Sequence, residues 1–104
     1  MKDEFKDLGN LDRLIHEPAR LMIVTILSGV DEADFLYLQR ETGLTKGNLS
    51  SHLSKLEGGG YVEINKTYRG RLPLTLCKLT DEGLQAFKAY YEQMRSFINT
   101  VDKK

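Results

Sequence analysis

The residues best suited to chemistry form one run of small, polar and basic side chains between positions 45 and 57. Leu49, Leu53 and Leu56 recur there at i, i+4 and i+7, which places them on one side of an α-helix. The opposite side and its flanks carry no carboxylate and consist of Gly47, Asn48, Ser50, Ser51, Ser54 and Lys55. Such donors suit phosphates and base edges, so this side predicts contact with a polyanion.

The ends of this helix are also encoded locally. Thr45 can cap the N-terminus by accepting a hydrogen bond from the backbone N–H of Gly47 or Asn48, and residues 58–60 are glycines that can end the helix. Lys46 lies in the first turn, where free backbone N–H groups can approach phosphate. We expect a helix over residues 45–57 that fits the major groove. The alternative is a surface helix whose serines only face water.

Length and charge limit the possible functions. A chain of 104 residues can build one hydrophobic core, so we expect one domain over residues 1–104. Fifteen basic residues balance fifteen acidic ones, but residues 1–34 hold four basic and eight acidic residues, a balance of −4. Residues 45–71 hold five basic and two acidic residues, a balance of +3. This segregation is expected of a protein with one anion-facing side.

Catalytic and metal-binding patterns are missing from the sequence. Cys77 is the only cysteine, and His16 and His52 are the only histidines, which leaves no metal-ligand cluster of recognisable spacing. No Ser-His-Asp, paired-carboxylate or phosphate-loop arrangement occurs either. We therefore expect Cys77 to be a buried structural thiol and His52 a hydrogen-bonded core residue, and we expect no cofactor, no metal and no enzymatic activity.

Targeting and membrane segments are not recognisable. Residues 1–7 form no apolar segment, and the apolar run over residues 21–27 is interrupted by Thr25 and too short for a bilayer. A cytoplasmic location without membrane contact is expected.

The segments before residue 45 should be mostly helical. Apolar residues at helical intervals predict a helix that begins near Leu8 and ends before Pro18, and a buried helix over residues 19–28. Residues 31–34 are expected to form an acidic turn.

A short helix over residues 35–42 is predicted next, capped by Asp34 and closed by Gly43. Two helices joined by a short turn that contains glycine form a helix-turn-helix, predicted here over residues 34–58. Residues 45–57 are then its second helix, the one positioned for recognition.

A β-hairpin should follow the glycines. Val62 and Ile64 alternate with polar residues as in a half-buried strand, and a second extended segment is expected over residues 74–79. Residues 61–79 would form a wing whose outer part, residues 66–73, lies along phosphates or enters a minor groove. The cations available for this contact are Lys66, Arg69 and Arg71. The alternative is a solvated loop.

The last predicted helix covers residues 80–101, with Thr80 as its N-cap. Its apolar residues step by 3, 4, 3, 4 and 3: Leu84, Phe87, Tyr91, Met94, Ile98 and Val101. Tyr90 and Phe97 broaden this seam beyond what one small domain is expected to cover, so we infer a partner helix from a second subunit. A small-molecule effector could bind beside the aromatic residues Tyr90, Tyr91 and Phe97 and next to Met94, although these side chains could equally be dimer core.

The ordered set of elements resembles a winged helix-turn-helix transcriptional regulator of the MarR/ArsR type, closest to its small single-domain members. The resemblance runs from about Leu11 to Met94. It rests on four patterns: Pro18-Ala19-Arg20-Leu21, the stretch from Leu44 to Leu53, Leu56-Glu57 with Gly60-Tyr61-Val62, and Leu79-Thr80-Asp81-Glu82-Gly83.

The resemblance implies a mainly α fold with a small β-hairpin (α+β), a winged helix-turn-helix with N- and C-terminal dimerisation helices. It also implies a homodimeric repressor on a pseudo-palindromic operator in double-stranded DNA. The implied dimer interface consists of Leu8, Leu11, Leu14, Ile15, Tyr90, Tyr91, Met94, Phe97, Ile98 and Val101. The metal-binding cysteines of ArsR-type sensors are not found at residues 35–40, which argues against metal sensing.

A second function is kept open. The winged helix could be a protein–protein interaction module without specific DNA binding, an alternative that the zero net charge slightly favours. The carboxylate-free side of residues 45–57 argues against it.

Overall fold

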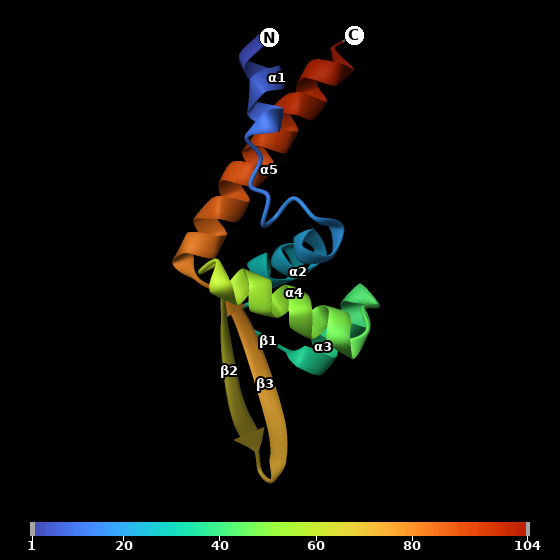
Figure 1. Ribbon diagram of the computed structural model, residues 1–104, viewed down its shortest axis with the longest axis vertical. Helices are drawn as coiled ribbons and strands as arrows, with labels where there is room; N and C mark the ends of the chain where they lie inside the picture. The colour runs from blue at the N-terminus through green and yellow to red at the C-terminus, as the bar shows by residue number, and fades with distance from the viewer. Residues whose placement is uncertain (1, 104) are drawn as a thin grey trace.

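The computed structural model describes residues 2–103, and the side chains of residues 5–103. Its elements are α1 (Lys2–Gly9), α2 (Pro18–Ser28), β1 (Ala33–Asp34), α3 (Phe35–Thr42), α4 (Lys46–Gly58), β2 (Val62–Arg69), β3 (Leu72–Leu79) and α5 (Asp81–Asp102). Helices α2, α3 and α4 pack together, the β2–β3 hairpin projects to one side, and α1 and α5 project the opposite way (Figure 1). The predicted fold class, a mainly helical winged helix, is confirmed.

One hydrophobic core joins the three central helices to the base of the sheet. Each helix contributes the stripe that its 3.6-residue period places on one side. The fully or almost fully buried members are Ile23, Val24, Leu27, Leu38, Leu49, Leu53, Leu56, Val62 and Cys77. Because Leu49, Leu53 and Leu56 of α4 are buried in this core, the opposite side of α4 faces outward.

The sheet has three antiparallel strands in the order β1-β3-β2. Residues 31–34 were expected to form only a turn, but Ala33 pairs with Cys77 and makes β1 an edge strand. The predicted second strand was too short, because β3 begins at Leu72, opposite Arg69, rather than at residue 74. Gly70, with φ +62°, therefore makes a tight turn at the hairpin tip.

The predicted helix from Leu8 to Pro18 is wrong. Helix α1 ends at Gly9, where the predicted helix had barely begun, and residues 10–17 form an irregular segment, called loop 10–17 below. Gly9 and Asn10 are poor helix formers. The Asp12 carboxylate also accepts hydrogen bonds from the backbone N–H groups of Leu14 and Ile15, at 2.9 and 3.2 Å, and so replaces helical bonds by a local turn.

Loop 10–17 folds back onto α5 and forms a second, smaller core. Leu11, Ile15 and Tyr90 are buried together there, and Leu8 and Met94 pack against them. Ile15 has no exposed surface. These three side chains, which were predicted to contact a second subunit, are enclosed by their own chain.

Other predicted interface residues of α5 remain accessible. Tyr91, Ile98 and Val101 expose 56%, 51% and 47% of their surface, and Phe97 is partly exposed. Leu14 does not lie with them, because it is partly buried against the main core.

Candidate nucleic-acid interface

Helix α4 is defined by the turn before it and by its own cap. Helix α3 ends at Thr42 and is closed by Gly43, whose φ of +72° reverses the chain. Thr45 then caps α4 by accepting a hydrogen bond from the N–H of Asn48 at 3.1 Å. The first turn of α4 contains no acidic residue that would offset the positive end of its dipole. The residues predicted to face a polyanion are all exposed: Thr45, Lys46, Gly47, Asn48, Ser50, Ser51, Ser54 and Lys55.

The junction between α4 and the hairpin is tied to loop 10–17 by a hydrogen bond. Helix α4 ends at Gly58, and the positive φ in the glycine run that follows falls on Gly60, at +83°. Tyr61 follows, and its hydroxyl donates a hydrogen bond to the Asp12 carboxylate. That hydrogen bond, together with burial, raises the pKa of Tyr61 to about 12, so the phenol remains a donor at neutral pH.

A groove of about 990 Å³ runs between the helix-turn-helix and the hairpin. It is lined by Lys46, Ser50 and Ser54 of α4 and by Lys66 and Arg69 of β2. These five residues were predicted to bind DNA, and the tertiary fold brings them to one concavity, the wing groove. The remaining predicted residues lie outside its lining: Thr45, Gly47, Asn48, Ser51, Lys55 and Arg71.

Two carboxylates in the wing groove were missed. Glu57 lines it because it follows Ser50 by seven residues, two helical turns, and so lies on the same flank of α4. That spacing could have been found in the sequence. Asp34 lines the groove from the start of α3, but its carboxylate accepts a hydrogen bond from the N–H of Tyr37 at 2.7 Å. The groove thus combines cations with two acidic groups, one of them engaged in a helix cap.

Two large apolar side chains were also missed. Leu36 on α3 and Leu72 on β3 line the wing groove and expose 69% and 70% of their surface. With Phe35, Ile64 and Leu74, which also line the groove, they make part of this concavity apolar.

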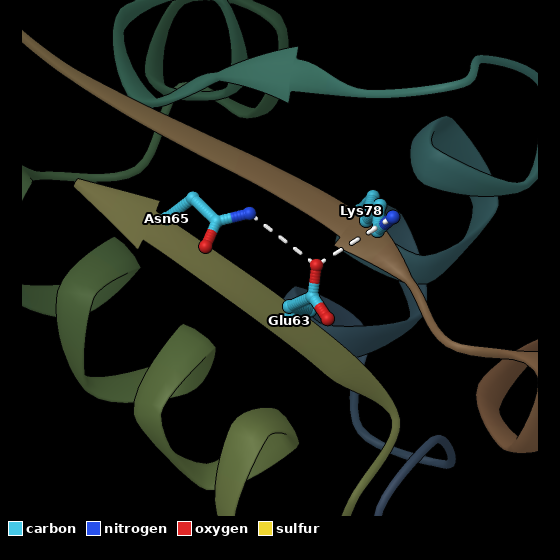
Figure 2. A network of polar contacts seen from close by, with 3 residues as sticks. All are labelled: Glu63, Asn65 and Lys78. Atoms are coloured by element: carbon cyan, nitrogen blue, oxygen red, sulfur yellow. Dashed lines mark hydrogen bonds and ion pairs between the residues drawn. The ribbon is translucent and has the colours of Figure 1, made fainter. Parts of the chain in front are cut away.

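The base of the hairpin carries a small polar network. Glu63 and Lys78 are direct cross-strand partners whose carboxylate and ammonium lie 3.5 Å apart, and the Asn65 amide donates to the same Glu63 oxygen at 3.3 Å (Figure 2). Lys78 is therefore paired. Within the described part of the chain Lys66, Arg69 and Arg71 form no ion pair, which concentrates unpaired positive charge toward the tip.

The remaining predictions concern the single cysteine, metal binding and membrane contact. Cys77 has no exposed surface, and burial raises the pKa of its thiol to about 11, which makes it unreactive at neutral pH. Among residues 5–103, no group of three or more potential metal ligands is found. No helix among residues 2–103 combines the length and hydropathy needed to cross a bilayer.

The aromatic wall predicted for an effector site is not assembled within one chain. Tyr90 points into the second core, where its hydroxyl lies 2.8 Å from Nδ1 of His16. Tyr91 instead lines a shallow depression of about 450 Å³ on α5 together with Phe87, Lys88 and Glu92.

Comparison with known proteins agrees with this arrangement. Residues 19–98 match a family model described as a winged helix DNA-binding domain. An uncharacterized protein of Methanocaldococcus jannaschii is 34% identical over 91 residues, which cover 86% of this chain and 98% of that protein.

Solved structures show the same architecture. The transcriptional regulator homologue protein from Pyrococcus horikoshii OT3 is 31% identical, with a TM-score of 0.88 over 96% of this chain and 98% of its own. A protein from Enterococcus faecalis assigned to the MarR family of transcriptional regulators shares the fold at 19% identity, with a TM-score of 0.79 over 94% of this chain and 88% of its own.

Proposed function

Because this chain belongs to the family of winged helix DNA-binding domains, we propose that it is a sequence-specific regulator that binds double-stranded DNA as a homodimer and represses transcription. The observation that carries the proposal is the exposed side of α4, which has hydroxyl, amide and ammonium groups beside a groove lined by further cations. Donors of this kind read base edges and phosphates.

Helix α4 enters the major groove in this proposal. Asn48 and Ser51 on its exposed side reach base edges, and the N-terminal turn approaches a phosphate through Lys46 and free N–H groups. The adjoining DNA strand passes through the wing groove, where Lys66 and Arg69 contact its backbone. Arg71 at the hairpin tip contacts phosphates that flank the neighbouring minor groove.

The homodimer forms through α5. This helix has 22 residues and is about 33 Å long at about 1.5 Å per residue, and Tyr91, Ile98 and Val101 leave an apolar stripe exposed along it. A twofold axis along this stripe would present two copies of α4 to one side of B-DNA, about 34 Å apart. The operator is then pseudo-palindromic.

The test begins with selection of genomic fragments by the purified protein at about 150 mM salt, where non-specific binding is weak. Specific fragments should outcompete random ones. Arg69→Ala with Arg71→Ala removes four phosphate contacts per dimer, so the slope of log affinity against log salt should fall by about 3.6. Lys78→Ala is the matched control, since Glu63 already pairs that ammonium, and it should change the slope much less.

The competing function is a protein-interaction module. The carboxylates of Glu57 and Asp34 in the wing groove and the zero net charge favour it. Under that function random and genomic fragments would compete equally, and the Arg69→Ala, Arg71→Ala variant would bind DNA no worse than the wild type.

A further inference from the structure

Arg20 of α2 lies outside the wing groove and contacts the opposite flank of α4. Its Nε donates to the backbone carbonyl of Leu14 at 2.6 Å, and its Nη2 donates to the carbonyl of Arg13 at 3.4 Å. Its Nη1 lies 3.2 Å from Nδ1 of His52, in the middle of α4. A guanidinium has no acceptor, so Nδ1 of His52 is the acceptor in this hydrogen bond, which requires the ring tautomer that carries its proton on Nε2.

The same loop 10–17 that receives Arg20 also holds the C-terminal end of α4. Leu14 packs directly on Gly59, where a Cβ atom would come within 2.2 Å of Leu14 Cδ2. The hydroxyl of Tyr61 donates to Asp12 in the same loop. Helix α4 is thus attached to loop 10–17 at its end through packing and at its middle through Arg20.

Loop 10–17 is attached to α5 as well. Nδ1 of His16 and the hydroxyl of Tyr90 are 2.8 Å apart, and Ile15 is buried against Tyr90. The segment that fixes α4 is therefore the segment that contacts the proposed dimerisation helix, so the angle between α4 and α5 depends on it.

We infer that Arg20 is a positioning residue for DNA recognition. Through its hydrogen bond to His52 it fixes the orientation of the exposed side of α4 relative to α5. The inference rests on the proposed function. With Arg20 removed, α4 keeps its core packing through its three buried leucines and its attachment near Gly59, but it loses the hydrogen bond that fixes its middle relative to loop 10–17. Base contacts tolerate only about 0.5 Å of displacement, whereas non-specific contacts to phosphate are less demanding.

The competing explanation is that Arg20 itself contacts a phosphate. Arg20→Gln separates the two, because loss of one phosphate contact per subunit lowers the salt slope by about 1.8 in a dimer, whereas loss of positioning leaves the slope unchanged. Lys66→Gln is the matched control, and it should lower the slope by about 1.8.

His52 provides the rescue experiment. In His52→Asn the amide oxygen can occupy the place of Nδ1 and accept from Arg20, so affinity for a selected fragment should stay within about threefold of the wild type. His52→Leu and Arg20→Gln remove this hydrogen bond, and each should weaken specific binding at least about tenfold while non-specific affinity changes less than about twofold. A purely structural role would not spare non-specific binding selectively, and urea unfolding of each variant checks that the fold is intact.

The outcomes are separable. If the wild type selects fragments and Arg20→Gln binds them within twofold of it, the inference is wrong and the proposed function stands. A slope decrease of about 1.8 in Arg20→Gln would also overturn it. So would an NMR spectrum of the imidazole nitrogens that finds the His52 proton on Nδ1, a measurement that needs no DNA. If the wild type selects no fragment, the inference falls together with the proposed function.

Discussion

Replacing Gly83 by alanine should destabilise the protein, although alanine is the better helix former. Gly83 is buried in the first turn of α5, and a Cβ atom there would lie 2.2 Å from the carbonyl oxygen of Tyr61 and 3.0 Å from its Cα. The obstacle is backbone, so no side-chain rotation can relieve it. The same carbonyl accepts a hydrogen bond from the N–H of Thr80 at 3.0 Å, which joins α5 to the hairpin.

The expected cost follows from the displacement. Van der Waals contact requires about 3.4 Å, so α5 or the Tyr61 peptide must move by roughly 1 Å. Overpacking that forces a backbone shift costs about 1–3 kcal/mol, and we expect the upper end because the Thr80 hydrogen bond is disturbed as well. Helix propensity alone predicts the opposite sign, a gain of up to about 1 kcal/mol for Gly83→Ala.

Gly58→Ala is the matched control. Gly58 is also helical, at the end of α4, and a Cβ atom there would meet nothing within 4 Å. The higher helix propensity of alanine should therefore raise the free energy of unfolding of Gly58→Ala. Urea unfolding followed by circular dichroism, at equal protein concentration for all variants, gives the free energies. The reasoning is refuted if Gly83→Ala is as stable as the wild type, or if both variants shift in the same direction.

Three further predictions concern the cap, the thiol and the dimer. Thr45→Ala removes the acceptor for the N–H of Asn48 and should lower the free energy of unfolding by about 1 kcal/mol, measured in urea; an unchanged value would contradict the cap. Burial raises the pKa of Cys77 from an ordinary value of 9.0 to about 11, so the protonated thiol favours the folded state. Its contribution is complete below pH 9 and is lost as pH rises toward 11, so the decline over this range should be smaller in Cys77→Ala, where the raised pKa of Tyr61 still contributes. Ile98→Asp places a charge on the exposed stripe of α5 and should shift the protein to monomers in sedimentation at micromolar concentration, with α-helical content retained; a persistent dimer would rule out this face as the interface.

The features that the sequence predicted correctly are mostly local. Asp34, Thr45 and Thr80 each accept a hydrogen bond from an N–H three residues ahead, so helix starts can be read from adjacent positions. The leucine stripe of α4 predicts its buried side for the same reason, since residues one turn apart share a side. The resemblance built on these patterns was confirmed by the match to winged helix DNA-binding domains.

The features that only the tertiary structure decided depend on partners distant in sequence. Loop 10–17 has helical apolar spacing, yet Asp12 bonds to Tyr61 and His16 to Tyr90, and these contacts bury the loop against α5 instead of leaving it helical. No periodicity within residues 10–17 encodes them. For the same reason Arg20, which the sequence presents as an ordinary basic residue of α2, is found bridging that loop to His52 of α4. Hydrophobic period and capping act over a few residues, whereas the orientation of one helix relative to another is set by side chains that meet only after the chain has folded.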